Sequence, residues 1–109
     1  MEISRGDLVA CVLPGDYGKP RPALVIQSDL FREHSSVTVL PITSFLRSAE
    51  IFRVLLKPNE ETGLRKASQV MVDKAVTLPR EKIGKRIGAV EVDTMLAVNR
   101  ALAVFLGFA

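Results

Sequence analysis

An arginine held between two prolines stands out in the first quarter of the chain. Pro20, Arg21 and Pro22 follow a Gly- and Asp-rich segment and precede an apolar run. Each proline fixes its own φ and lacks an N–H, and Pro22 pushes Arg21 toward an extended backbone. A guanidinium held in this way can bind a phosphate or a carboxylate through two parallel hydrogen bonds. The spacing indicates an anion-binding arginine at the mouth of a loop; the alternative is a solvated charge at the start of a strand.

Short strand patterns account for most of the chain around this arginine. The sequence predicts strands at residues 8–13, 22–28, 37–44, 52–56, 69–73 and 86–90. The turn-rich loop 14–19 joins the first two as an antiparallel hairpin. Because side chains alternate along a strand, Thr43 should share a face with Val37 and Val39, and Ser44 should point the other way. Pro41 cannot donate to a ladder, which predicts an edge or a bulge there.

Helical spacing replaces the strand pattern near the end of the chain. An apolar periodicity with an acid in the first turn and Gly107 after the last predicts a helix over residues 92–106. Single helical turns are predicted after Ser28, as an N-cap, and after Pro79. Met95, Leu96 and Leu102 are expected at core or dimer positions. The stripe that shares this spacing comprises Val92, Met95, Leu96, Asn99, Leu102, Ala103 and Leu106.

These elements predict a mainly β fold with a C-terminal α-helix: one domain, residues 1–109, built on a strongly curved sheet or small barrel. Several strands are apolar on both faces, from which we infer surplus apolar surface and a homodimer. Apolar content is 48% and charged content 25%, typical of a globular chain. The net charge of +3 weakly favours an anionic partner.

The few cysteine and histidine residues exclude several classes of site. Cys11 and His34 are single, so an intrachain disulfide and a thiolate or imidazole metal cluster are both excluded. We expect neither a metal nor a cofactor. Charged residues interrupt the N-terminus where a signal peptide would be apolar, and no stretch approaches the ~20 apolar residues of a membrane span. A cytoplasmic location fits these features.

The motifs, taken in order, resemble the MazF/PemK family of toxin endoribonucleases. The resemblance is carried by residues 5–9, 15–27 and 40–44, and continues through 63–64, 67–70, Asp73, 77–83 and the terminal helix. It implies an SH3-like barrel, of the type shared with CcdB, that works as a homodimer. It also implies cleavage of single-stranded RNA, often mRNA, at short sequences, and silencing by a cognate antitoxin protein from a neighbouring gene.

The resemblance also assigns roles in a metal-free cleavage, in which the ribose 2′-OH attacks the adjacent phosphorus and leaves a 2′,3′-cyclic phosphate and a 5′-OH. This step needs a proton acceptor and stabilisation of charge on the phosphate oxygens. The family's catalytic arginine and threonine fall on Arg21 and Thr43. Asp16 lies where some relatives carry a loop acid, and is a candidate general base; the alternative is a turn-forming aspartate.

Other residues are candidates for contact with RNA. Tyr17 and Lys19, in the loop before Arg21, can stack on a base and hold a phosphate. Ser44 is a weaker candidate because it should face away from the catalytic threonine. Asp73 matches the base of one branch of the family, but that branch has an arginine where this chain has Met71. This departure leaves Asp73 as an RNA-contacting or structural residue.

Two other functions compete with the nuclease. A CcdB-like gyrase poison acts without catalytic residues and depends on its C-terminal tail, and this chain ends in Gly107, Phe108 and Ala109. A non-catalytic SH3-like module would bind RNA without cutting it. Because Arg21 and Thr43 are both retained, the sequence favours the nuclease.

Overall fold

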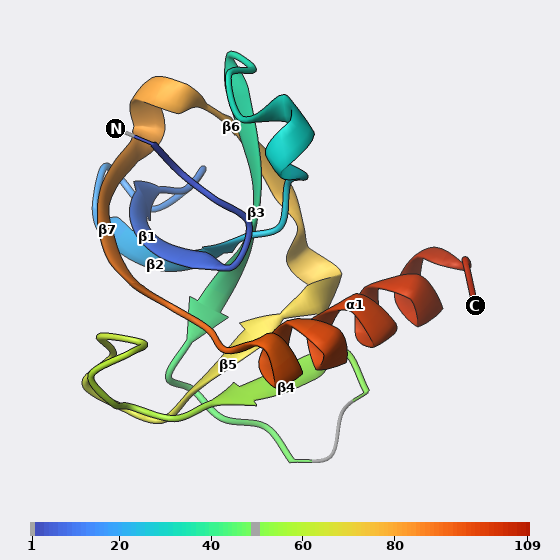
Figure 1. Ribbon diagram of the computed structural model, residues 1–109. Helices are drawn as coiled ribbons and strands as arrows, with labels where there is room; N and C mark the ends of the chain where they lie inside the picture. Colours follow the sequence, from blue (N-terminus) through green and yellow to red (C-terminus); the bar gives the residue numbers. More distant parts are fainter. Residues whose placement is uncertain (1, 49–50) are drawn as a thin grey trace.

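The computed structural model describes residues 2–48 and 51–109, and it consists of a curved antiparallel sheet with one long helix beside it (Figure 1). The strands are β1 (Asp7–Val12), β2 (Pro20–Val25), β3 (Ser36–Thr43), β4 (Arg53–Leu56), β5 (Ser68–Met71), β6 (Val76–Pro79) and β7 (Ile83–Ala89). Single-turn 3-10 helices are η1 (Asp29–Phe31), η2 (Val72–Lys74) and η3 (Arg80–Lys82), and the long helix is α1 (Val92–Leu106). The strand order is β4-β5-β3-β2-β1-β7, and β6 also pairs with β3.

The predicted hairpin is confirmed, with one shift in its second strand. β1 and β2 pair antiparallel, and Cys11 lies opposite Arg21. We expected Arg21 at the mouth of a loop. β2 begins at Pro20 and ends at Val25, so the arginine instead lies inside a strand. The ladder to β3 covers residues 23–25 of β2, so both prolines lie where the strand pairs with β1 alone. Proline is tolerated at such edge-like positions because no second neighbour requires its N–H.

Each face of the central strands packs into its own apolar cluster. Leu8, Leu24 and Leu40 pack with residues of α1 on one face. The alternate residues Val9 and Val39 pack into a second cluster on the other face, together with Ile3, Cys11, Ala23, Val25, Val37 and Leu78. Strands that are apolar on both faces are therefore buried within one chain. These buried faces are not surplus surface, and the homodimer that we inferred from such surface stays a prediction.

The segment after β5 differs most from the prediction. β5 ends at Met71, and Asp73 lies in η2 instead of a strand. β6, which the sequence analysis missed, then continues along the same edge of β3: β5 pairs with residues 42–43 and β6 with residues 36–39. Within the described ladders, Pro41 has no partner on that edge, which confirms the break predicted there. η2 supplies the bend between the two ladders.

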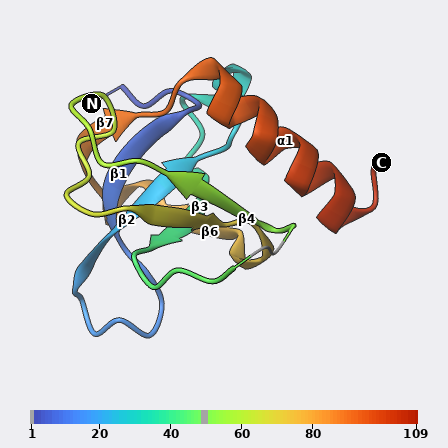
Figure 2. The same cartoon turned by 90° about the horizontal axis from the view of Figure 1, so that it is seen from below.

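The helix α1 has the predicted bounds, and Gly107 ends it in the left-handed conformation at φ 85°. The predicted stripe is only partly buried: Met95 and Leu102 pack against the sheet, whereas Val92 is 75% exposed and Leu96 46% exposed. The residues that pack against the sheet are Met95, Val98, Ala101 and Leu102. Helical periodicity fixes the spacing of a stripe, but the sheet beneath decides which apolar face it covers. Figure 2 shows α1 as a separate layer along one side of the strands. In the part of the chain that the structure describes, no helix is long and apolar enough to cross a membrane.

Candidate active site

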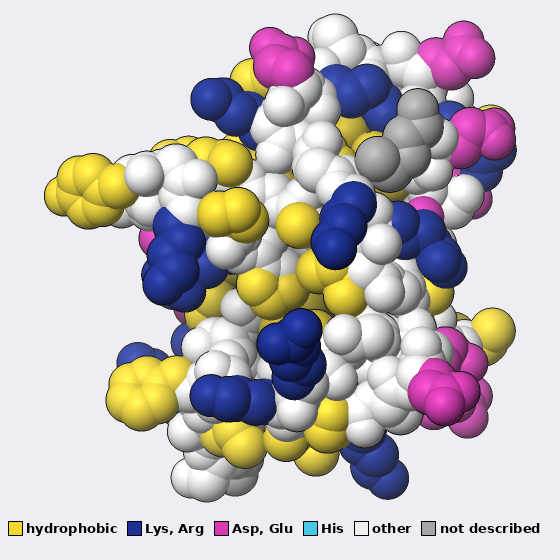
Figure 3. Space-filling model, turned by 90° about the vertical axis from the view of Figure 1, so that its left-hand side faces the viewer, with side chains coloured by type: hydrophobic (Ala, Val, Ile, Leu, Met, Phe, Trp, Pro, Cys, Tyr) yellow, Lys and Arg dark blue, Asp and Glu magenta, His cyan; other side chains and the backbone are white. Residues whose placement is uncertain are grey.

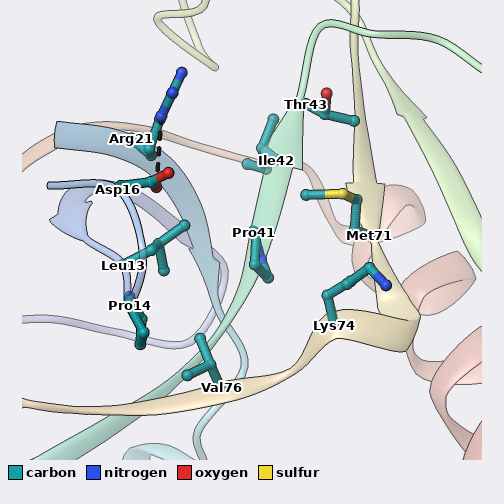
Figure 4. Close-up of a pocket in the computed structure, with 10 residues that line it drawn as sticks. All are labelled: Leu13, Pro14, Asp16, Arg21, Pro41, Ile42, Thr43, Met71, Lys74 and Val76. Carbon is teal, nitrogen blue, oxygen red and sulfur yellow. Dashed lines mark ion pairs between the residues drawn. The ribbon is translucent and has the colours of Figure 1, made fainter. Parts of the chain in front are cut away.

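A cavity of about 580 Å³ lies between the β1–β2 hairpin and the segment from β5 to β6 (Figure 4). β3 runs between the two walls. The lining residues are Leu13, Pro14, Asp16, Arg21, Pro41, Ile42, Thr43, Met71, Lys74 and Val76. Three residues that the sequence analysis proposed for catalysis thus line one cavity.

Neighbouring strands carry Arg21 and Thr43. Ala23 pairs with Pro41 at the end of the antiparallel ladder between β2 and β3. Arg21 and Thr43 each lie two residues beyond this last pair, where β2 pairs with β1 and β3 pairs with β5. Because side chains alternate, both lie on the face of the sheet that carries Val39, as predicted for the threonine. Two neighbouring strands therefore position the pair just beyond the end of the ladder that joins them.

The carboxylate of Asp16 holds the inner nitrogen of Arg21. Its Oδ2 lies 3.5 Å from Nε of the arginine, and the two side chains are 28% and 45% exposed. The aspartate is fixed by turn hydrogen bonds, in which its N–H donates to the carbonyl of Leu13 and its carbonyl accepts from Lys19. Among the described residues, the terminal guanidinium nitrogens have no partner. They are the two donors that a bidentate contact with a phosphate needs.

The hydroxyl of Thr43 is oriented by its own strand end. The backbone N–H of Phe45 donates to Thr43 Oγ1 at 3.0 Å. The oxygen therefore serves as an acceptor for the backbone, and its hydrogen remains available to donate toward the cavity. Thr43 is half-buried. This arrangement suits a hydroxyl that donates to a phosphate oxygen.

Cys11 lies directly across the hairpin from Arg21 and is buried. Burial, together with the smaller effect of the negative charge of Asp16, raises the pKa of its thiol to about 11. The thiol is therefore neutral at physiological pH and inert as a nucleophile. Within the described residues, no three His, Cys, Asp or Glu side chains lie close enough together to hold a metal ion.

Four proposed RNA-contacting residues lie outside the cavity lining. Tyr17 is fully exposed at the tip of the loop before β2, with a positive φ of 53°. Lys19 is exposed on the same loop, and Ser44 is exposed just after β3. The Asp73 side chain is 18% exposed, and its Oδ2 lies 3.6 Å from the amine of Lys74.

Lys74 is a lining residue that the sequence analysis missed. A strand would have placed it on the opposite face from Met71, because side chains alternate. In the 3-10 turn η2, residues three apart lie on one side, so Met71 and Lys74 both line the cavity. The sequence analysis missed Lys74 because it did not predict this turn, which neither a proline nor a glycine marks in the sequence.

The comparisons with known proteins agree with this geometry. The family described as "PemK-like, MazF-like toxin of type II toxin-antitoxin system" matches residues 4–106. A relative from Mycolicibacterium smegmatis, a "Probable endoribonuclease MazF", is 42% identical over 108 residues, which cover 98% of this chain and 99% of that protein.

Solved structures of mycobacterial toxins share the fold. An endoribonuclease from a Mycobacterial species, in complex with its cognate antitoxin, has a TM-score of 0.83 at 26% identity and covers 98% of this chain and 97% of its own. The Mycobacterium tuberculosis toxin MazF-mt6 has a TM-score of 0.81 at 26% identity and covers 93% of this chain and 96% of its own. The chain therefore belongs to the PemK-like, MazF-like toxins of type II toxin-antitoxin systems.

Proposed function

We propose that this toxin is a metal-independent endoribonuclease that cleaves single-stranded RNA, mRNA included, at short sequences. The supporting observation is that Arg21 and Thr43 face one cavity from adjacent strands. A relative 42% identical over nearly its whole length is named as a probable endoribonuclease. A gyrase poison or a binding module needs no such pair.

Arg21 and Thr43 stabilise the charge that develops when the 2′-OH attacks phosphorus. The terminal nitrogens of Arg21 donate to the nonbridging oxygens of the phosphorane, and the Thr43 hydroxyl donates to one of them. Loss of a charge-stabilising donor such as the Arg21 guanidinium typically costs about 10²–10³ in rate. The step forms the 2′-oxygen–phosphorus bond and breaks the bond to the 5′-oxygen. It gives a cyclic phosphate and, once the leaving oxygen takes a proton from water, a 5′-OH.

Asp16 is the proposed acceptor of the 2′-OH proton. It lines the same cavity, and its ion pair at 3.5 Å places the carboxylate beside the guanidinium that binds the phosphate. An acceptor must lie within hydrogen-bonding reach of the hydroxyl that it deprotonates. The same ion pair also orients the Arg21 side chain. Asp16 therefore has two proposed roles, as the proton acceptor and as the residue that orients Arg21.

RNA extends beyond the cavity over residues that the loops expose. We propose that Tyr17 stacks on a base, that Lys19 holds a backbone phosphate and that Ser44 contacts the strand as it leaves β3. Asp73 acts through its neighbour Lys74. Figure 3 shows several Lys and Arg side chains around an apolar hollow on one face, as an anionic and partly apolar ligand requires.

A second copy of the chain and an antitoxin are the proposed protein partners. A groove of about 470 Å³ between β4 and α1 is lined by Ile51, Arg53, Val54, Leu55, Ala97, Arg100, Ala101 and Val104. Exposed apolar surface of this kind marks interaction sites, and we propose that it is covered in a homodimer of SH3-like barrels. A cognate antitoxin silences the toxin in the cytoplasm, where mRNA is found.

End mapping of cleaved RNA tests the function. Purified protein is incubated with mixed-sequence RNA in EDTA, and the new ends should carry 2′,3′-cyclic phosphate and 5′-OH. Arg21→Ala should abolish cutting, whereas Arg32→Ala, an arginine paired with Asp29 outside the cavity, should not. Intact RNA together with inhibited gyrase would favour the CcdB-like poison. RNA that is retained but uncut would favour the binding module.

A further inference from the structure

The position of Lys74 points to a role in reading a base. We propose that its ammonium donates a hydrogen bond to O4 of uracil or O6 of guanine in a base beside the scissile phosphate, and so selects these two bases at that position. The inference rests on the proposed function, because it assumes that the cavity binds RNA. It assigns the lysine to sequence specificity, while Arg21 and Thr43 act on the phosphate.

The cavity has two chemically different ends (Figure 4). Arg21 and Thr43 lie at one end, on either side of Ile42. The other end is mostly apolar and is formed by Leu13, Pro14, Pro41 and Val76, and Met71 lies between Thr43 and Lys74. Apolar walls suit the flat faces of a base, whereas a phosphate requires donors. A nucleotide whose phosphate meets Arg21 therefore places its base toward the apolar end.

Lys74 stands at this apolar end. Among the described residues, it is the one cationic side chain besides Arg21 that lines the cavity. An ammonium has donors and no acceptor, so it bonds to a keto oxygen but not to an exocyclic amino group. Uracil and guanine carry a keto oxygen where cytosine and adenine carry an amino group, and lysine recognises guanine in this way in DNA complexes. The chemistry of Lys74 thus selects keto bases.

Asp73 holds the amine of Lys74 near the cavity and leaves some of its hydrogen-bond donors available. Its Oδ2 lies 3.6 Å from Nζ of Lys74, and the lysine side chain remains 60% exposed. Its other oxygen, Oδ1, is buried and has no hydrogen-bond partner among the described residues. A half-buried carboxylate with spare acceptor capacity holds the ammonium beside η2, at the wall of the cavity that Lys74 lines. Asp73 is therefore a positioning residue for Lys74.

Cleavage of a randomised RNA library tests the role of Lys74. The library is cut to low extent by the wild type and by Lys74→Ala, Lys74→Gln and Lys82→Ala, and the ends are sequenced. The wild type should prefer U or G over A or C at one position next to the cut. Lys74→Ala should lower that preference about tenfold, as expected for loss of one charged hydrogen bond. Lys74→Gln offers both a donor and an acceptor and should also flatten it.

Controls separate base reading from other roles. Lys82 is an exposed lysine in η3 that does not line this cavity, and Lys82→Ala should keep the wild-type preference. Lys74→Arg keeps a cationic donor and should retain most of the preference. Asp73→Asn, which weakens the tether, should lower it partly. Thermal unfolding of each variant shows whether the fold is intact.

Two results would overturn the proposal. If Lys74→Ala slows cutting equally at all sequences, the lysine contacts a phosphate instead of a base. If it changes neither rate nor preference, it has no role in recognition. Should the wild type cut no RNA, the proposed function fails, but retention of a 2′-fluoro RNA pool, which lacks the nucleophile, still measures the base preference of Lys74.

Discussion

Replacement of Thr43 by valine separates the catalytic role of its hydroxyl from its structural one. Valine keeps the branched shape and the strand preference of threonine but has no hydroxyl. In the structure, Oγ1 accepts from the backbone N–H of Phe45 at 3.0 Å, and its hydrogen is available for a phosphate. Thr43→Val therefore removes one contact within the protein and one proposed contact with the transition state.

The two losses differ in size and in assay. The side chain of Phe45 is 86% exposed, and its N–H lies at an exposed strand end where water can replace the lost acceptor. The free energy of unfolding in urea should therefore fall by no more than about 1 kcal/mol. A hydrogen bond to a charged phosphate is worth about 1.5–3 kcal/mol, so single-turnover cleavage should slow about 10- to 150-fold.

Thr43→Ser is the matched control, because serine restores the hydroxyl while losing the methyl group. It should cleave within about threefold of the wild type if the hydroxyl matters. Cleavage by Thr43→Val at the wild-type rate, with a normal fold, would refute the donor role. Equal losses for serine and valine would assign the effect to packing instead.

Three further predictions concern the fold around the site. Gly88→Ala should cost about 1–3 kcal/mol in urea unfolding, because a Cβ there meets backbone carbonyls of the neighbouring loop; Gly18→Ala, with a positive φ but open space, should cost about 1 kcal/mol. A hydrogen bond from the backbone N–H of Arg5 lowers the pKa of Asp29 in the folded state. The ionised carboxylate therefore stabilises the fold above about pH 4, and this stabilisation is lost as the pH falls through the folded pKa. Asp29→Asn should reduce the loss of unfolding free energy between neutral and acid pH. The pKa of about 11 for Cys11 leaves roughly 100-fold less thiolate at pH 8 than in the unfolded chain, so Ellman's reagent should react quickly only after unfolding.

Local patterns predicted those parts of the fold that depend on neighbouring residues alone. The bounds of α1 and the face of Thr43 both follow from a periodicity that tertiary packing does not change. The buried face of α1 could not be predicted in this way. Both Leu96 and Val98 fit an apolar stripe, and the shape of the sheet decides that the second is buried. Contacts between distant elements choose among faces that the sequence leaves equivalent.

The same distinction explains what the sequence revealed of the site. Arg21 was found because two prolines restrict its backbone, and Thr43 through the resemblance to a known family. Lys74 was missed because a single 3-10 turn changes which residues share a side, and neither proline nor glycine marks that turn. β6 was missed for a related reason: it is a short strand that forms where β3 offers a free edge beyond Pro41.

The elements that hold these residues indicate how this toxin can change its target without losing activity. Arg21 and Thr43 stand on strands whose neighbours are buried in both apolar clusters, so their spacing is as rigid as the core. Lys74 stands on a single turn and Tyr17 on an exposed loop tip, where substitutions cost little stability. The residues proposed for catalysis stand on strands and those proposed for recognition stand on turns, so the two sets can vary independently. From that separation we expect variants of this chain that keep one mechanism and differ in cut site, and Lys74 is where this can be tested.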